Sequence, residues 1–427
     1  MKITLQGGRV IDPANKIDER MDVHVAAGQI AALGNAPDGF TPNRIIDVSE
    51  QIVCPGFIDL GARLREPGDR HKATIASETA AAASAGITTL ICPPDTNPVA
   101  DTPAVIELIH TTAEQAGMAR ILPTGAITQG LKGEQLSEIA ALKEAGCIAV
   151  SNIMQPYSST QVQRRAFEYA ATFGLSIFIH PLDQGLAAGG CAHEGAICTR
   201  MGLTGIPEAA ETMAVARNLV IIEQTGVRAH FARLSSARAA QMISRARYDG
   251  LPITADVAAH QLFLTEHDIW QFNSECHVIP PLRSDRDRDG LRDGLAQGVI
   301  QCICSDHQPH EADAKLAPFP STEPGISALE TLLPLTLRMV TDGVLDLGDA
   351  IATISSQPAS VLGIDSGNLS AGNVADICVF DPEREWILDE DTLVSHGLNT
   401  PFLGWHLKGR VTHTLLAGRP VYELNDD

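Results

Sequence analysis

Eight short apolar segments alternate with helical segments through most of this chain. Short apolar runs bounded by glycine and polar residues are typical of buried parallel strands. Eight alternations of strand and helix predict an α/β fold, a (β/α)8 TIM barrel with its functional residues at the C-terminal ends of the strands. A doubly wound open sheet is the alternative, but no glycine-rich phosphate loop supports it. The apolar segments lie near residues 52–63, 87–94, 120–127, 147–152, 175–180, 227–234, 251–257 and 299–306.

Helix signals follow most of these segments. The clearest helix runs from Asp101 to Gly117, where Asp101 can cap the start, Pro103 suits the first turn and Gly117 can close the end. The other predicted helices span residues 134–146, 160–174, 207–226 and 235–250.

Both chain ends have a different pattern, in which apolar and polar residues alternate between glycine turns. This pattern predicts short antiparallel strands. Neither end alone has enough strands for a stable core, so we expect the two ends to form one small β-domain. The predicted boundaries are 1–52 and 366–427 for the two parts of that domain and 53–365 for the barrel.

Composition narrows the range of partners and compartments. The formal net charge of −21 argues against nucleic acid and anionic membranes, which both need basic surfaces. No segment has the roughly 20 apolar residues that cross a bilayer, and no signal peptide begins the chain. The nine cysteines fit reduced, buried thiols better than a disulfide framework. We therefore expect a cytoplasmic protein.

One stretch carries a family resemblance. The sequence Cys54-Pro-Gly-Phe-Ile-Asp-Leu-Gly-Ala-Arg-Leu-Arg-Glu-Pro-Gly68 resembles the first barrel strand of the amidohydrolases, and its Leu-Arg-Glu-Pro-Gly resembles the dihydroorotases in particular. Further motifs of that branch extend the resemblance over most of the chain. They include Pro94-Asp-Thr-Asn-Pro98, Gly202-Leu-Thr-Gly-Ile-Pro207, Pro280-Pro-Leu-Arg283 and Ser305-Asp-His-Gln-Pro-His310.

The resemblance implies a zinc centre, yet the positions of its ligands differ here. The family's first strand carries two zinc-binding histidines, and this chain has Gly61 and Arg63 instead. Glycine offers no ligand, and arginine stays charged and repels a cation. The bridging acid of the fourth strand is replaced by Asn152-Ile153, and Arg233 stands where the sixth strand has its second histidine. Only His180 and Asp306 remain, whereas a catalytic zinc ordinarily has three protein ligands.

The substrate-binding positions are mixed. Arg65 matches the family arginine that pairs with the substrate carboxylate, and His310 matches a substrate-contacting histidine. Asp95 and Ile279 each replace an asparagine, and an acidic Asp95 opposes an anionic ligand. An ion pair of Arg65 with Glu66 or Asp59 is the structural alternative. We also expect the Arg63 and Arg233 guanidinium groups to occupy the metal volume and pair with Asp306 or its neighbours, because an unpaired buried carboxylate is costly.

Three functions fit these observations. The first is a non-enzymatic dihydroorotase homologue with no cofactor. It would serve as the assembly partner of the catalytic chain of aspartate transcarbamoylase in pyrimidine biosynthesis, as a homodimer or higher hetero-oligomer, a role the resemblance implies. The second is an active cyclic amidase whose single metal is held by His180, Asp306 and a cysteine. The third is a sensor that binds dihydroorotate or carbamoyl aspartate through Arg65 without turnover. The missing ligands favour the first function.

Overall fold

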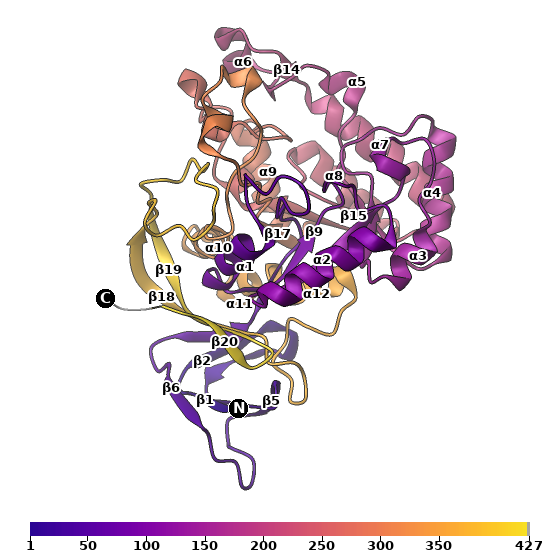
Figure 1. The fold of residues 1–427 in the computed structure, drawn as a ribbon. Helices are drawn as coiled ribbons and strands as arrows, with labels where there is room; N and C mark the ends of the chain where they lie inside the picture. The colour runs from indigo at the N-terminus through magenta and orange to yellow at the C-terminus, as the bar shows by residue number, and fades with distance from the viewer. Residues whose placement is uncertain (425–427) are drawn as a thin grey trace.

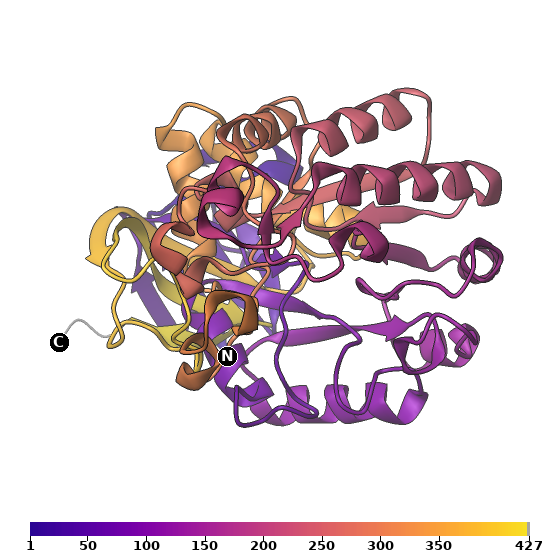
Figure 2. The same ribbon diagram turned by 90° about the horizontal axis from the view of Figure 1, so that it is seen from above.

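The computed structural model describes residues 1–424 and confirms the (β/α)8 barrel (Figures 1 and 2). Eight parallel strands form one sheet in the order β17-β16-β15-β12-β11-β10-β9-β8. The sheet closes where Ala62 forms a parallel bridge with His307 and where Asp59 accepts a 2.8 Å hydrogen bond from the Ser305 amide. The strands are β8 (Phe57–Asp59), β9 (Ile87–Cys92), β10 (Arg120–Ala126), β11 (Ala149–Ser151), β12 (Ser176–Ile179), β15 (Ala229–Phe231), β16 (Ile253–Ala258) and β17 (Cys302–Cys304).

Helices cover the outside of this sheet, as Figure 2 shows most clearly. Gly117 ends α2 in the left-handed conformation, as predicted. Asp101 does not cap that helix, because its carboxylate accepts a hydrogen bond from the Gly130 amide in the next loop. The helices are α1 (Ile75–Ser84), α2 (Pro103–Ala116), α3 (Ile139–Glu144), α4 (Thr160–Thr172), α5 (Gln184–Ala187), α6 (Ala196–Met201), α7 (Glu208–Thr225), α8 (Ala237–Tyr248), α9 (Asp285–Ala296), α10 (Leu332–Thr341), α11 (Leu347–Thr353) and α12 (Ser356–Leu362).

Strands from both chain ends lie together in a six-stranded sheet below the barrel (Figure 1). The C-terminal β18 pairs with the N-terminal β7, and Cys54 stands opposite Cys378 in that ladder. Strands β1, β4, β5 and β6 form a second sheet, and the two sheets enclose a separate apolar core. The strands are β1 (Lys2–Gln6), β2 (Arg9–Asp12), β3 (Ile17–Arg20), β4 (Val23–Ala26), β5 (Gln29–Leu33), β6 (Arg44–Asp47), β7 (Ile52–Pro55), β18 (Ile377–Ile387), β19 (His406–Leu416) and β20 (Arg419–Glu423).

Within residues 1–424, every helix is too short or too polar to pass through a lipid bilayer. The residue numbers predicted for the domain boundaries stay predictions.

Candidate active site at the barrel mouth

An arginine–aspartate pair occupies the centre of the barrel mouth. Arg233 follows β15, Asp306 follows β17, and Arg233 Nη1 donates a hydrogen bond to Asp306 Oδ1. Only 5% of the Arg233 side chain and 2% of the Asp306 side chain are exposed. Burial acts to lower the pKa of Arg233, but the Asp306 carboxylate outweighs it and raises that pKa. The guanidinium group therefore stays charged beside the carboxylate.

Arg63 joins this pair from the first strand. Its Nε donates a 2.7 Å hydrogen bond to Asp95 Oδ2, and its Nη1 lies 3.8 Å from Asp306 Oδ1. Burial acts to raise the pKa of Asp95, yet the neighbouring guanidinium groups, Arg63 first, lower it. Both arginines point inward and pair with carboxylates, in agreement with the expectation from the sequence.

Two neutral histidines border the pair. Burial first, and then the charges of Arg233 and Arg63, hold the pKa of His180 well below its ordinary value. His260, in the turn after β16, is 2% exposed, and burial lowers its pKa to about 4. The Nδ1 atoms of both rings are buried without a hydrogen-bond partner in the described part of the chain. His260 was not among the residues expected from the sequence, although its place at the end of the seventh strand is where a barrel puts functional residues.

Arg65 contacts a strand-8 loop and not an acid. Its Nε donates to the Pro309 carbonyl at 2.9 Å, and its Nη2 lies 2.9 Å from His310 Nε2. Lys72, which is 8% exposed and was also missed, lies 3.3 Å from His310 Nδ1. Burial, Arg65 and Lys72 together lower the pKa of His310 to about 3. The alternative ion pair of Arg65 with Glu66 or Asp59 is wrong, because Glu66 pairs with Arg70 and Asp59 accepts from Ser305.

The remaining predicted positions carry no group that could bind a reactant. Asn152 uses both ends of its amide, accepting from Thr128 Oγ1 at 2.5 Å and donating to the Gln155 carbonyl at 3.0 Å. Ile153 is buried and has a positive φ of 51°. A side-chain atom added at Gly61 would meet nothing within 4 Å, so open space lies beside the first strand.

The donors in the mouth do not fit the zinc centre that the family resemblance implies. Asp306 Oδ1 already accepts hydrogen bonds from Arg233 and from Gln308 Nε2, the latter at 3.1 Å. Cys304, the nearest thiol in sequence, points its sulfur at Asp256 at 3.5 Å. Within residues 1–424, no three side chains of histidine, cysteine, aspartate or glutamate are grouped as metal ligands. The single-metal arrangement of His180, Asp306 and a cysteine does not form either.

Guanidinium groups outnumber carboxylates in the buried part of the mouth. Arg63, Arg65 and Arg233 lie there with Asp95 and Asp306, whereas Lys72 pairs with the exposed Glu323 at 3.6 Å. The two cavities here measure about 40 Å³ beside Arg65 and about 10 Å³ beside His180. The mouth therefore suits an anionic group, and the arginine side chains fill most of it.

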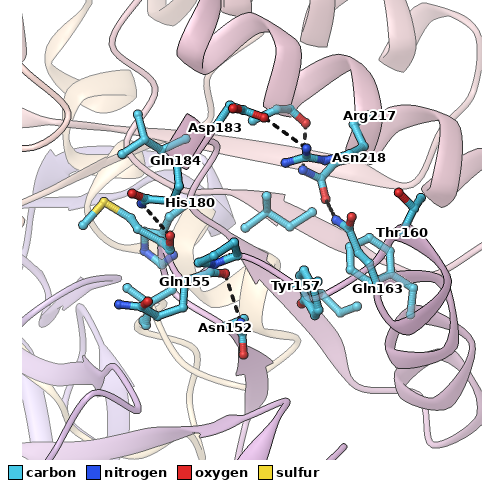
Figure 3. A pocket seen from close by; sticks show the side chains of 18 of the residues that line it. Asn152, Gln155, Tyr157, Thr160, Gln163, His180, Asp183, Gln184, Arg217 and Asn218 are labelled. Carbon is cyan, nitrogen blue, oxygen red and sulfur yellow. Dashed lines mark hydrogen bonds and ion pairs between the residues drawn. The ribbon is translucent and has the colours of Figure 1, made fainter. Parts of the chain in front are cut away.

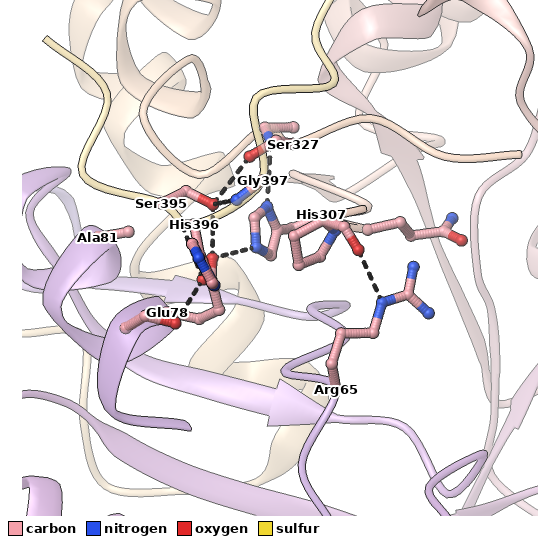
Figure 4. Close-up of polar contacts among 12 residues, drawn as sticks. Arg65, Glu78, Ala81, His307, Ser327, Ser395, His396 and Gly397 are labelled. Carbon is pink, nitrogen blue, oxygen red and sulfur yellow. Dashed lines mark hydrogen bonds and ion pairs between the residues drawn. The ribbon is translucent and has the colours of Figure 1, made fainter. Parts of the chain in front are cut away.

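A buried network holds the strand-8 loop in place (Figure 4). His307 lies 2.8 Å from Glu78 Oε2, and Ser395 Oγ donates to the same oxygen at 2.6 Å. On the other ring nitrogen, His307 Nδ1 accepts from the Ala328 amide at 3.0 Å, which makes Nε2 the protonated nitrogen. This network joins α1, the residue after Asp306 and the C-terminal segment.

Comparisons with known proteins agree with this architecture. A family model described as "Dihydro-orotase-like" matches residues 50–239. A "Dihydroorotase-like protein" of Pseudomonas putida is 51% identical over 98% of both chains. A "Dihydroorotase" of Syntrophotalea carbinolica is 42% identical over 100% of both chains. The solved L-hydantoinase (dihydropyrimidinase) from Arthrobacter aurescens superposes with a TM-score of 0.89 over 99% of this chain and 96% of that one, at 23% identity, which supports the fold alone.

These findings correct one prediction. The expectation that the chain is not an enzyme is wrong, because a relative 42% identical over the whole chain is named as an enzyme. The prediction equated the loss of metal ligands with the loss of activity. In the structure, a carboxylate, neutral histidines and fixed positive charge all remain at the strand ends.

Proposed function

Because this chain belongs to the dihydroorotase-like family of amidohydrolases, we propose that it hydrolyses a carboxylate-bearing cyclic amide at the barrel mouth. The observation that carries the proposal is the buried group of Arg63, Arg233 and Asp306. It joins a proton acceptor to fixed positive charge where the strands end. Relatives named dihydroorotase indicate the class of substrate.

In this reaction Asp306 accepts a proton, and an arginine stabilises negative charge. Among the described residues, the contacts of Asp306 all fall on Oδ1, which leaves Oδ2 to take a proton from an attacking water. As the water oxygen bonds to the ring carbonyl carbon, a guanidinium group stabilises the charge on the carbonyl oxygen. The proton then passes to the ring nitrogen as the C–N bond breaks, and the product is an open-chain carbamoyl acid.

Entry of a substrate requires a side chain to move. The cavity of about 40 Å³ beside Arg63 and Arg65 is far smaller than the roughly 150 Å³ that holds one six-membered ring. Rotation of Arg63 away from Asp95 would enlarge it and free a cation for the substrate carboxylate. A guanidinium group does not lower the pKa of water as a metal ion does, so we expect slow turnover.

A ring-opening assay tests this function. Purified protein from a host without its own dihydroorotase is given dihydroorotate, dihydrouracil or hydantoin, and loss of the ring is followed by absorbance. We expect slow turnover with a preference for dihydroorotate, and a loss of about 100-fold or more in Asp306→Asn, as is usual for a general base. The exposed α8 variant Gln241→Leu serves as the control. Equal rates in the wild type and Asp306→Asn, or no turnover, would reject the proposal.

Association with the catalytic chain of aspartate transcarbamoylase stays a prediction from the family resemblance, and three exposed apolar side chains favour it. Trp270, Phe272 and Leu316 are 52%, 51% and 78% exposed. Their two segments are joined by a hydrogen bond from Lys315 to the Ser274 carbonyl at 3.2 Å. Exposed aromatic residues are typical of protein interfaces. Less transcarbamoylase should co-purify with the variant Trp270→Ala/Phe272→Ala than with the wild type. The control Tyr248→Ala, at an exposed aromatic residue on α8, should recover the wild-type amount. Equal recovery of transcarbamoylase in all three proteins would count against this surface.

A further inference from the structure

A polar cavity of about 160 Å³ lies between β12 and the helices α4 and α7 (Figure 3). Its wall comes from the loop of residues 152–157, from β12 and from α4, α5 and α7. The catalytic proposal uses none of its helical residues. It therefore forms a second space in the molecule, four times the volume of the cavity beside Arg65.

Hydrogen bonds fix the chemistry of one wall. The Ala214 carbonyl can only accept, so Asn218 must donate to it through Nδ2, at 2.7 Å. Asn218 Oδ1 then faces Gln163, which must donate through Nε2, at 2.8 Å. This chain of donors turns Gln163 Oε1 into an acceptor without a partner among residues 1–424, on a side chain that is 4% exposed. Because this oxygen is not fully enclosed by protein atoms, it can accept a hydrogen bond from the N–H group of a ligand, or from water, in the cavity.

The other polar groups of the cavity repeat this pattern. Gln184 donates its Nε2 to the Met154 carbonyl at 2.7 Å, which leaves a second side-chain carbonyl as an acceptor. The Tyr157 hydroxyl makes no hydrogen bond with the described residues, so it can donate to a carbonyl oxygen. Burial raises the pKa of Tyr157 well above its ordinary value, and the phenol stays protonated.

The cavity carries no uncompensated charge. Its two charged residues, Arg217 and Asp183, pair with each other at 3.1 Å. An ion would lose its hydration here without gaining a counter-charge, which is unfavourable. The ligand that fits is neutral.

We propose that this cavity binds one neutral, planar amide or lactam about the size of a single six-membered ring. The volume matches the roughly 150 Å³ that accepts a benzene-sized molecule. The ligand presents N–H groups to Gln163 and Gln184 and a carbonyl oxygen to Tyr157. Phe167, Ile177 and Ile179 supply the apolar faces for the ring. This site adjoins the cationic mouth, with which it shares His180, but it does not depend on the proposed reaction.

Two ligands with the same ring test the assignment. Uracil is a neutral lactam, and orotate is the same ring with a carboxylate. Calorimetry on the full chain should show uracil binding, undiminished when orotate saturates the mouth. Gln163→Leu removes the acceptor and Tyr157→Phe removes only a hydroxyl that the fold does not use. Each should weaken uracil binding by about tenfold, the loss expected for one hydrogen bond. Gln241→Leu is the matched control outside the cavity.

Three outcomes would overturn the proposal. They are no uracil binding up to its solubility limit, displacement of uracil by orotate in the wild type, and equal uracil affinity in the wild type and Tyr157→Phe. Because Tyr157→Phe retains the ring, its thermal midpoint should match the wild type, so a failure to fold cannot imitate a loss of binding.

Discussion

The buried Arg233–Asp306 ion pair should affect the free energy of unfolding. Removing one partner of a buried ion pair leaves an uncompensated charge and costs about 3–5 kcal/mol. Arg63 lies 3.8 Å from the same oxygen, so Arg233→Met should fall at the lower end of that range. Replacing both partners, in Arg233→Met/Asp306→Leu, should recover most of the loss.

Urea unfolding measures both variants. Arg200→Met, at an exposed arginine on α6, should leave the free energy of unfolding within about 0.5 kcal/mol of the wild type. If Arg233→Met is as stable as this control, the pair does not contribute to folding.

Because the pKa of His260 is lowered in the folded protein, we expect the folded state to lose stability in acid. Its pKa is about 4 when folded and about 6.5 in an unfolded chain. Below about pH 6.5 the unfolded chain binds a proton that the folded chain excludes, so stability falls as the pH drops towards 4, by about 1.4 kcal/mol per pH unit for one group. Above that window the group contributes no pH dependence.

The variant His260→Gln should flatten the curve of unfolding free energy against pH between about pH 6.5 and about pH 4.5. The His310 and His277 rings, with pKa values of about 3 and about 4, will still contribute their own slope. An unchanged slope in His260→Gln would show that the ring is protonated in the folded protein.

At the scale of elements, α1 and the C-terminal segment support the mouth through Glu78. Its carboxylate accepts four hydrogen bonds: from Ser77 and the His396 amide on Oε1, and from Ser395 and His307 on Oε2. Glu78→Gln replaces one carboxylate oxygen with an NH2 group. That group can only donate, and it would face two groups that also donate. We expect unfolding free energy to fall by about 2 kcal/mol, since a buried unsatisfied group costs about 1–3 kcal/mol. Glu107→Gln on the exposed face of α2 is the control for denaturant unfolding.

The sequence predicted elements better than it predicted contacts. Seven of the eight barrel strands lie within the predicted apolar segments, and β16 extends one residue past its segment, to Ala258. A parallel strand is buried on both faces, so its consecutive residues are apolar and can be recognised in the sequence. The predicted helix at 134–146 begins only at Ile139, because Thr128 forms an antiparallel bridge with Leu136 and draws that segment into a turn. Tertiary pairing of this kind leaves no local signal.

For the candidate site too, only some residues could be located from the sequence. The strand-end arginines and Asp306 could be located because the barrel puts strand ends together. His260 could have been located in the same way, because it follows the seventh strand. Lys72 could not, since its significance comes from burial and from His310, which is distant in sequence. The cavity beside α4 was likewise invisible, because the orientation of Gln163 depends on Asn218, 55 positions away.

For the whole molecule, the donor set predicts that stability does not depend on a metal. With Asp306 held by Arg233 and the first strand carrying Gly61 and Arg63, a divalent ion would meet positive charge where it needs lone pairs. Chelator treatment should therefore leave the thermal midpoint unchanged, and protein purified with added zinc should retain far less than one ion per chain.

A designed variant provides the positive control for that experiment. The open space beside Gly61 admits a side chain, so Gly61→His/Arg63→His would place two imidazoles two residues apart after β8, with His180 and Asp306 across the mouth. This variant should bind zinc, and chelator should lower its thermal midpoint, because a ligand that binds only the folded state stabilises it. Stoichiometric zinc in the wild type, with a chelator-sensitive midpoint, would show that the arginines move aside for a metal and that the resting arrangement of the mouth is not its working one.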